Sequence, residues 1–149
     1  MKFKQFASGY LIKDNKVLLV HHRKFNKWVP PGGHIEDEET PDQTLTREFL
    51  EETSLKIAVI RTTPSPFEGD SNATPIPVPF YMDLEREGFD VPHIGHFYFV
   101  KVVGNNFEVK HQETEAHEIK WFTIDEIDNL ETFDQVKALA KFAIKNYPA

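Results

Sequence analysis

Three glutamates, Glu48, Glu51 and Glu52, lie close together in a segment with helical features. On a helix they fall within an arc of about 100°, so they present three carboxylates on one face. Like charges at this spacing destabilise a helix by about 0.2–0.5 kcal/mol per pair in water, and a divalent cation reverses that sign. Carboxylates without cysteine suit Mg²⁺ or Mn²⁺, and Mg²⁺ usually binds substrate phosphates as well. The pattern therefore indicates phosphate chemistry at a metal site.

The surrounding segment is unusually acidic. Residues 36–52 hold 8 of the 24 carboxylates of the chain, namely Glu36, Asp37, Glu38, Glu39, Asp42, Glu48, Glu51 and Glu52. Such a run is most often a solvated face or a disordered segment. Here it is interleaved with Leu45, Phe49 and Leu50 and opposed only by Arg47, which favours a structured segment whose acidity has a function.

The elements that must position these glutamates follow from capping and periodicity. Thr40 and Gln43 form a capping box with Pro41 in the first turn, which predicts a helix from about Pro41 to Thr53. An N-terminal hairpin over Phe6 to His22 turns at Asp14-Asn15. Further strands are expected at Lys56 to Arg61, His93 to Val103 and Ile119 to Phe122, followed by a short helix capped by Thr123 and a last helix carrying Val136, Leu139, Ala140 and Ala143. This order predicts an α/β fold with a mixed sheet covered by helices on both faces.

Thr62 to Pro92 contains six of the ten prolines and has no sustained period. Structureless loops of that length are uncommon unless they are functional. We therefore expect a substrate-facing excursion without regular structure.

Length and composition restrict the class of protein. A chain of 149 residues predicts one domain over residues 1–149, and no stretch is apolar enough to span a membrane. The lack of cysteine and of a secretory signal in Met1 to Gln5 fits a cytoplasmic protein. The formal charge of −7 argues against polymeric nucleic acid as a partner.

A family resemblance rests on the same segment. Gly33, Glu39 and the run from Arg47 to Leu55 resemble the Nudix box of the Nudix (MutT-like) hydrolases, over 23 residues of the chain. The flanking segments Trp28 to Gly33 and Glu118 to Thr123 also resemble strands of that family. The resemblance implies a Nudix-type α/β/α sandwich with a mixed β-sheet between helices.

The resemblance also implies roles for individual residues. Glu51 and Glu52 would be the main metal ligands, joined by Glu48 and the backbone carbonyl of Gly32, and Gly33 would present its backbone to metal or phosphate. Glu39 and Arg47 would pair through two hydrogen bonds and fix the ligands. A further acidic ligand is expected among Glu113, Glu115 and Glu118, of which Glu115 is favoured. The last glycine of the box is Ser54 here, which predicts a left-handed residue after the helix at a cost of about 1 kcal/mol.

The implied reaction is attack of metal-polarised water on a diphosphate bridge, with Glu48 or the downstream glutamate as base. Oxidised nucleoside triphosphates, ADP-ribose, dinucleotides and sugar nucleotides all stay open as substrates. An idle nucleotide-sensing domain is the main alternative. Isoprenoid diphosphate isomerisation would need a cysteine, and a purely structural domain would bind no Mg²⁺. A homodimer is the commonest closed assembly.

Other residues are given structural roles. Trp28, Phe67, Phe80 and Tyr81 could stack on a base, but aromatic side chains are more often part of the core. The spacing of His34, His93 and His96 makes no metal motif. We therefore place none of them in the site.

Overall fold

The computed structural model describes residues 2–110 and 116–148. Its elements in chain order are β1 (Lys4–Lys13), β2 (Lys16–His22), β3 (Lys27–Val29), β4 (Gly32–His34), α1 (Pro41–Thr53), β5 (Ile57–Val59), β6 (Tyr81–Glu85), β7 (His93–Val102), β8 (Ala116–Phe122), α2 (Ile124–Asp128) and α3 (Asp134–Asn146). The predicted helix at Pro41–Thr53 is confirmed with its bounds.

The strands form one mixed sheet with the order β3-β2-β1-β7-β5, to which β4, β6 and β8 add through β1, β7 and β2. β1 and β7 run parallel over eight residue pairs, whereas the other described pairings are antiparallel. The predicted N-terminal hairpin is present, because Asp14 and Asn15 both have positive φ and join Lys13 to Lys16. Such a two-residue turn matches the natural twist of paired strands.

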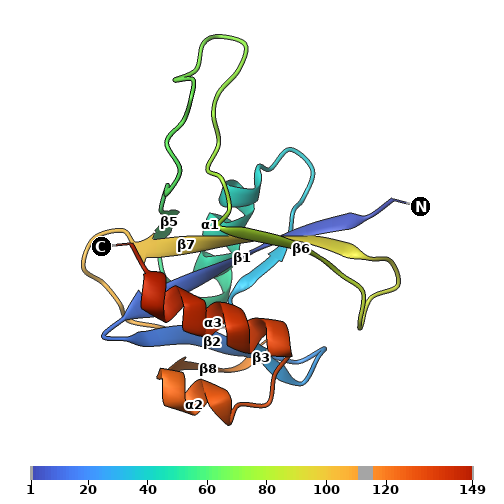
Figure 1. Ribbon diagram of the computed structural model, residues 1–149, viewed down its shortest axis with the longest axis vertical. Helices are drawn as coiled ribbons and strands as arrows, with labels where there is room; N and C mark the ends of the chain where they lie inside the picture. The colour runs from blue at the N-terminus through green and yellow to red at the C-terminus, as the bar shows by residue number, and fades with distance from the viewer. Residues whose placement is uncertain (1, 111–115, 149) are drawn as a thin grey trace.

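Helices cover both faces of the sheet (Figure 1). On one face Leu45 and Phe49 of α1 pack with Leu11 and Val100, and on the other Leu139 and Ala143 of α3 pack with other core side chains from the strands. The predicted sandwich with helices on both sides of a mixed sheet is therefore confirmed. No helix within residues 2–110 and 116–148 has the length and apolarity that crossing a membrane requires.

The proline-rich segment only partly follows its prediction. Residues 60–80 contain neither helix nor strand and rise from the body of the protein as a long excursion (Figure 1). The expectation of an irregular loop up to Pro92 is wrong, because Tyr81–Glu85 pairs along β7 as strand β6. This strand is difficult to predict from the sequence because acidic residues, Asp83 and Glu85, occupy one of its faces where apolar residues are expected.

Candidate active site

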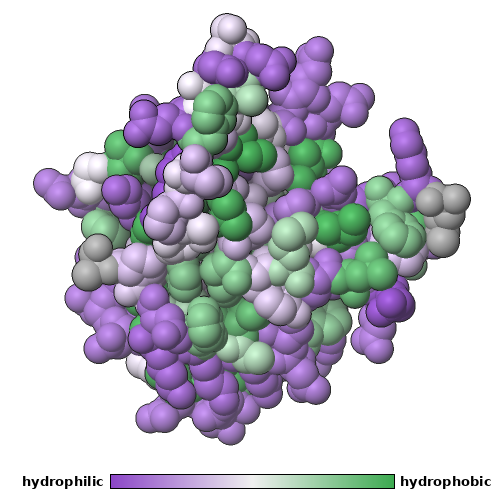
Figure 2. All heavy atoms as spheres, turned by 45° about the horizontal axis from the view of Figure 1, so that its top comes forward, coloured by the Kyte–Doolittle hydropathy of each residue, from purple (hydrophilic) through white to green (hydrophobic). Residues whose placement is uncertain are grey.

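A cleft of about 800 Å³ is bounded by α1, β4, β6 and α3. Its volume lies within the range of small-molecule sites, about 300–1,000 Å³. Glu48, Glu52, Gly32 and Gly33 line one part of it. On the face shown in Figure 2, apolar residues lie among hydrophilic ones.

Gly32 and Gly33 of β4 lie against two of the three glutamates. The backbone N–H of Gly32 donates to Glu52 Oε1 at 3.1 Å, and Glu52 is only 5% exposed. A Cβ on Gly33 would lie 2.4 Å from the carboxylate of Glu48, so only glycine lets the two groups approach this closely. The backbone of β4 therefore lies in close contact with the carboxylates of α1.

Arg47 and Glu39 form the pair that the sequence predicted. Arg47 donates from Nε to Glu39 Oε2 at 2.8 Å and from Nη2 to Glu39 Oε1 at 3.0 Å. The hydroxyl of Thr44 donates to the same carboxylate at 2.8 Å. These hydrogen bonds, that of Arg47 first, lower the pKa of Glu39 from 4.5 to about 2. The pair thus ties the loop before α1 to the middle of the helix.

The same guanidinium reaches the other carboxylates. Nη1 of Arg47 donates to Glu48 Oε1 at 3.0 Å and to Glu51 Oε2 at 3.3 Å. The side chain of Glu51 is 54% exposed and does not line the cleft. We call Glu48, Glu51 and Glu52 the glutamate cluster.

The glutamate cluster offers the ligand atoms that hard divalent cations prefer, since it consists of carboxylate oxygens beside a glycine backbone. In the part of the chain that the structure describes, however, no three acidic, histidine or cysteine side chains are arranged to hold a metal ion. Arg47 donates hydrogen bonds to Glu48 and Glu51, and the Gly32 N–H donates to Glu52. The donor types fit the predicted cation, and its binding stays a proposal.

The further acidic ligand expected downstream is not found among the described residues. Glu113 and the favoured Glu115 lie outside them. Glu118 is described, but its side chain is 56% exposed, pairs with Lys120 at 3.2 Å and does not line the cleft.

Sequence reasoning missed a second group of carboxylates in the cleft. Asp83 and Glu85 lie on one face of β6, and both accept hydrogen bonds from Nε2 of Gln135 on α3, at 2.8 and 3.0 Å. Burial first, and then the contact with Asp83, raise the pKa of Glu85 from 4.5 to about 8. We call Asp83 and Glu85 the acid pair. The alternation in Tyr81-Met82-Asp83-Leu84-Glu85 was the signal that could have revealed it.

The aromatic residues divide between core and cleft. Phe80 stacks on Phe99 with ring centroids 4.4 Å apart, and Trp28 contacts Phe122 at 4.9 Å, so both are core residues as expected. Phe67 is 50% exposed on the excursion. Tyr81 lines the cleft, where the side chains contributed by residues 62–92 all come from Tyr81 onward.

Two histidines, His34 and His93, contact each other at the wall of the cleft. His34 and His93 meet through their Nε2 atoms at 2.8 Å, and Nδ1 of His93 bonds to the carbonyl of Val91 at 2.8 Å. They make a hydrogen-bonded pair at the cleft wall, consistent with the structural role predicted for them.

A helix-sheet-helix sandwich with carboxylates facing the glycines of β4 defines a class of small α/β proteins, and comparison with known proteins identifies the family. A family model described as NUDIX domain matches residues 4–142. The chain therefore belongs to the Nudix family, whose hydrolases act on small nucleotide substrates.

Curated relatives share parts of the chain. A protein of Buchnera aphidicola subsp. Schizaphis graminum named 8-oxo-dGTP diphosphatase is 35% identical over 65 residues, which cover 41% of this chain and 50% of that protein. A probable DHNTP pyrophosphohydrolase of Lactococcus lactis subsp. cremoris is 26% identical over 100 residues, covering 61% of this chain and 60% of the relative. The chain thus spans about half the length of these relatives.

Solved structures extend the likeness in fold to the whole chain. A hydrolase of the NUDIX family from Clostridium perfringens superposes with a TM-score of 0.83 at 24% identity and covers 97% of this chain and 98% of its own. A UDP-X diphosphatase gives a TM-score of 0.66 at 18% identity, covering 97% of this chain and 64% of that structure. At these identities the likeness establishes the fold.

Proposed function

We propose that this protein hydrolyses the diphosphate linkage of a nucleoside diphosphate derivative with Mg²⁺ or Mn²⁺. The observation that carries the proposal is the buried carboxylate of Glu52, held by the Gly32 N–H at 3.1 Å beside Glu48 on the wall of the cleft. A buried carboxylate is costly unless a hydrogen bond or a cation compensates it. Its position at the helix face therefore favours a site built for positive charge.

Each residue of the site has a proposed task. Glu48, Glu51 and Glu52, with the carbonyl of Gly32, hold the cation. When bound, the cation neutralises the phosphates and polarises the attacking water. Arg47 and Glu39 keep α1 and its preceding loop in register, so they are positioning residues.

The reaction breaks one P–O bond of the bridge and forms one between phosphorus and the oxygen of water. Its products are a monophosphate and a second phosphorylated fragment. The proton of the water passes to Glu48 or to a downstream glutamate, for which we keep Glu115 as the candidate. The exposed position of Glu118 and its pairing with Lys120 disfavour that residue.

The names of the curated relatives support a nucleoside triphosphate as substrate, since one is named for 8-oxo-dGTP and another for DHNTP. ADP-ribose, dinucleotides and sugar nucleotides belong in the same test. The direct experiment is a panel of these compounds with Mg²⁺ or Mn²⁺, scored by release of the phosphorylated products.

Glu52→Gln is the decisive variant in that panel. We expect its rate to fall at least about a hundredfold, because the change removes a group that acts on charge in the transition state. Glu131→Gln, a change at an exposed glutamate, is the matched control and keeps the wild-type rate. Unchanged turnover in Glu52→Gln contradicts the proposal, and no turnover of any compound by the wild type favours the idle nucleotide-sensing domain instead.

A further inference from the structure

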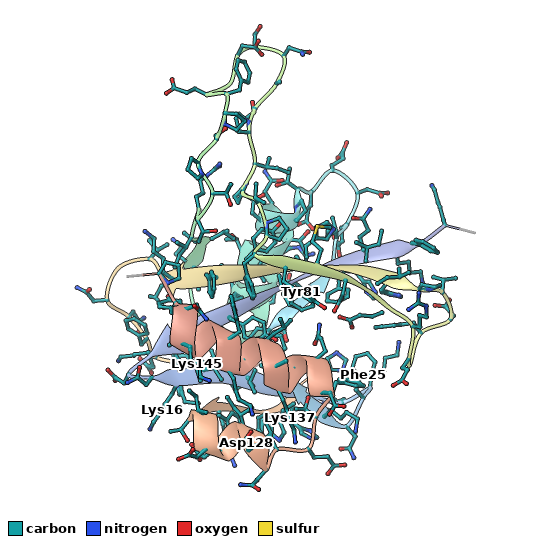
Figure 3. The ribbon with its side chains drawn as sticks, viewed as in Figure 1. Lys16, Phe25, Tyr81, Asp128, Lys137 and Lys145 are labelled. Carbon is teal, nitrogen blue, oxygen red and sulfur yellow. The ribbon has the colours of Figure 1, made fainter. Side chains whose placement is uncertain are left out.

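The acid pair has no paired cationic side chain. Within residues 2–110 and 116–148, neither Asp83 nor Glu85 forms an ion pair with lysine or arginine. Lys24 lines the cleft, but its ammonium lies over the rings of Phe25 and Phe89, 5.6 and 5.3 Å from their centroids. Phe25 itself lies beside the N-terminal end of α3 (Figure 3). Among the described residues, the charge of the acid pair is therefore not balanced by a lysine or an arginine.

One oxygen of Asp83 is buried and has no hydrogen-bond partner among the described residues. Nε2 of Gln135 donates to Oδ2 of Asp83 and to Oε2 of Glu85, at 2.8 and 3.0 Å, so the amide does not satisfy Oδ1 of Asp83. Gly95 on β7 is the register partner of Asp83. A Cβ on Gly95 would lie 3.0 Å from Oδ1 and 2.7 Å from a ring carbon of Phe6. The oxygen therefore lies close to a glycine backbone and an apolar ring.

A second buried polar atom lies near the acid pair. The hydroxyl of Tyr10 also has no hydrogen-bond partner within the described part of the chain, and Tyr10 is fully buried. Burial first, and then the charges of Glu85 and Asp83, hold the pKa of Tyr10 well above its usual value, so its hydroxyl lies near both carboxyl groups. Buried polar atoms without a partner are costly unless a ligand or a water molecule satisfies them. Two such atoms beside the acid pair point to a ligand that contacts both.

The charge of the acid pair indicates which ligand this is. Burial first, and then the contact with Asp83, raise the pKa of Glu85 to about 8, so the pair keeps one proton and one negative charge near neutral pH. A water molecule would satisfy the hydrogen bonds but would leave that charge unbalanced. An alkali cation balances it, and oxygen atoms of a protein can replace its hydration shell. Mg²⁺ fits less well, because it demands near-ideal octahedral geometry and loses its waters reluctantly.

We propose that Oδ1 of Asp83 and the hydroxyl oxygen of Tyr10 bind a monovalent metal cation, Na⁺ or K⁺, beside the cleft, and that Gln135 holds Asp83 in position for it. Asp83 lies on β6, Tyr10 on β1 and Gln135 on α3, so the bound cation connects three elements and stabilises the folded state. The site is separate from the glutamate cluster. It requires neither a divalent cation nor turnover, and it is therefore tested independently of the proposed function.

Thermal unfolding in different salts tests the cation site without any substrate. The wild type is unfolded in KCl, NaCl and choline chloride at equal concentration, with EDTA to remove divalent metals. Choline is too large for the site, and equal concentrations keep general screening the same. We expect the midpoint in KCl or NaCl to lie about 2–4 °C above that in choline chloride, the shift for a cation at about five times its Kd.

Variants locate the site. Asp83→Asn and Tyr10→Phe each remove one ligand, and the shift between salts should fall below about 1 °C in both. Glu87→Gln, a change on the same segment, should keep the full shift. Glu52→Gln should keep it as well, because the glutamate cluster is not part of this site.

Equal midpoints of the wild type in the three salts overturn the inference and favour a buried water molecule instead. A full shift retained in both Asp83→Asn and Tyr10→Phe overturns it too. The line width of the sodium NMR signal guards against variants that fail to fold. Broadening by the wild type that KCl removes and that Glu52→Gln keeps supports the site, whereas absence of broadening and of any shift in KCl refutes it.

Discussion

Glu48 and Glu52 of the glutamate cluster line the same cleft as the acid pair, but the charges of the two groups are balanced in different ways. Around the glutamate cluster, Arg47 reaches Glu39, Glu48 and Glu51 at 2.8–3.3 Å. The acid pair is held by the uncharged amide of Gln135, and a raised pKa of Glu85, about 8, keeps a proton on it near neutral pH. The negative charge of the glutamate cluster is therefore balanced by the guanidinium of Arg47, whereas the charge of the acid pair is reduced by a bound proton.

The two groups of carboxylates therefore respond differently to pH. The pKa of Glu39, about 2, means that the Arg47–Glu39 pair stays ionised across the neutral range. The acid pair changes its charge in that range, because burial favours its protonated form. We therefore expect mutations around the glutamate cluster to alter turnover and mutations of the acid pair to alter the pH dependence of stability.

After Glu52→Gln, the largest effect is expected from Arg47→Lys. Lysine cannot reproduce the two parallel hydrogen bonds to Glu39, so kcat/KM should fall about 10- to 100-fold, as for other groups that orient metal ligands. Steady-state kinetics check this, and Arg61→Lys, the same change at an exposed arginine, is the control. Similar kinetics for the two variants would show that the guanidinium geometry does not position the cluster.

Glu85→Gln tests the proton of the acid pair through stability. Since the pKa of Glu85 is raised in the folded protein, its contribution to stability is present below pH 4.5 and is lost as the pH rises towards about 8. The wild type should lose on the order of 2 kcal/mol of unfolding free energy over this interval relative to Glu85→Gln, less than the full pKa shift corresponds to, because solvent screens this partly exposed group. Urea unfolding at several pH values measures the free energy of unfolding. If this free energy changed with pH in the same way in both proteins, Glu85 would not carry a proton in the folded protein.

Gly33→Ala sharpens the role of the close backbone approach. The new Cβ would lie 2.4 Å from the Glu48 carboxylate and must displace it, so we expect about a tenfold loss in kcat. In a protein that already carries Glu48→Ala, the same change should add less than about a twofold loss, because its partner in the clash is gone. Additive losses in this double-mutant cycle would refute the proposed clash.

The smallest effect is expected at the end of α1. Ser54 has φ 65° and ψ 11°, the left-handed conformation predicted for the position where the box has glycine. Ser54→Gly should raise the unfolding free energy by about 1 kcal/mol, measured by urea unfolding, and leave turnover unchanged. A loss of stability would mean that the serine side chain contributes more than the backbone strain costs.

The two regions also differ in how far the sequence could predict them. α1, its start at Pro41 and the Arg47–Glu39 pair lie within one short stretch, where capping and spacing act locally. The acid pair depends on Gln135, which is 52 residues from Asp83 in the chain. No local rule joins β6 to α3, and the prolines before Tyr81 hide the strand. The close contact between the backbone of Gly33 and the carboxylate of Glu48 could not be predicted from the sequence either, because it depends on how β4 packs against α1.

The proposed function requires the glutamate cluster to bind a divalent cation. Mn²⁺ titration followed by electron paramagnetic resonance tests it without any substrate. We predict that the wild type and Glu131→Gln bind Mn²⁺ equally, and that Glu52→Gln binds it at least about tenfold more weakly. Mn²⁺ binding by Glu52→Gln as tight as that of the wild type would contradict the proposed cation site.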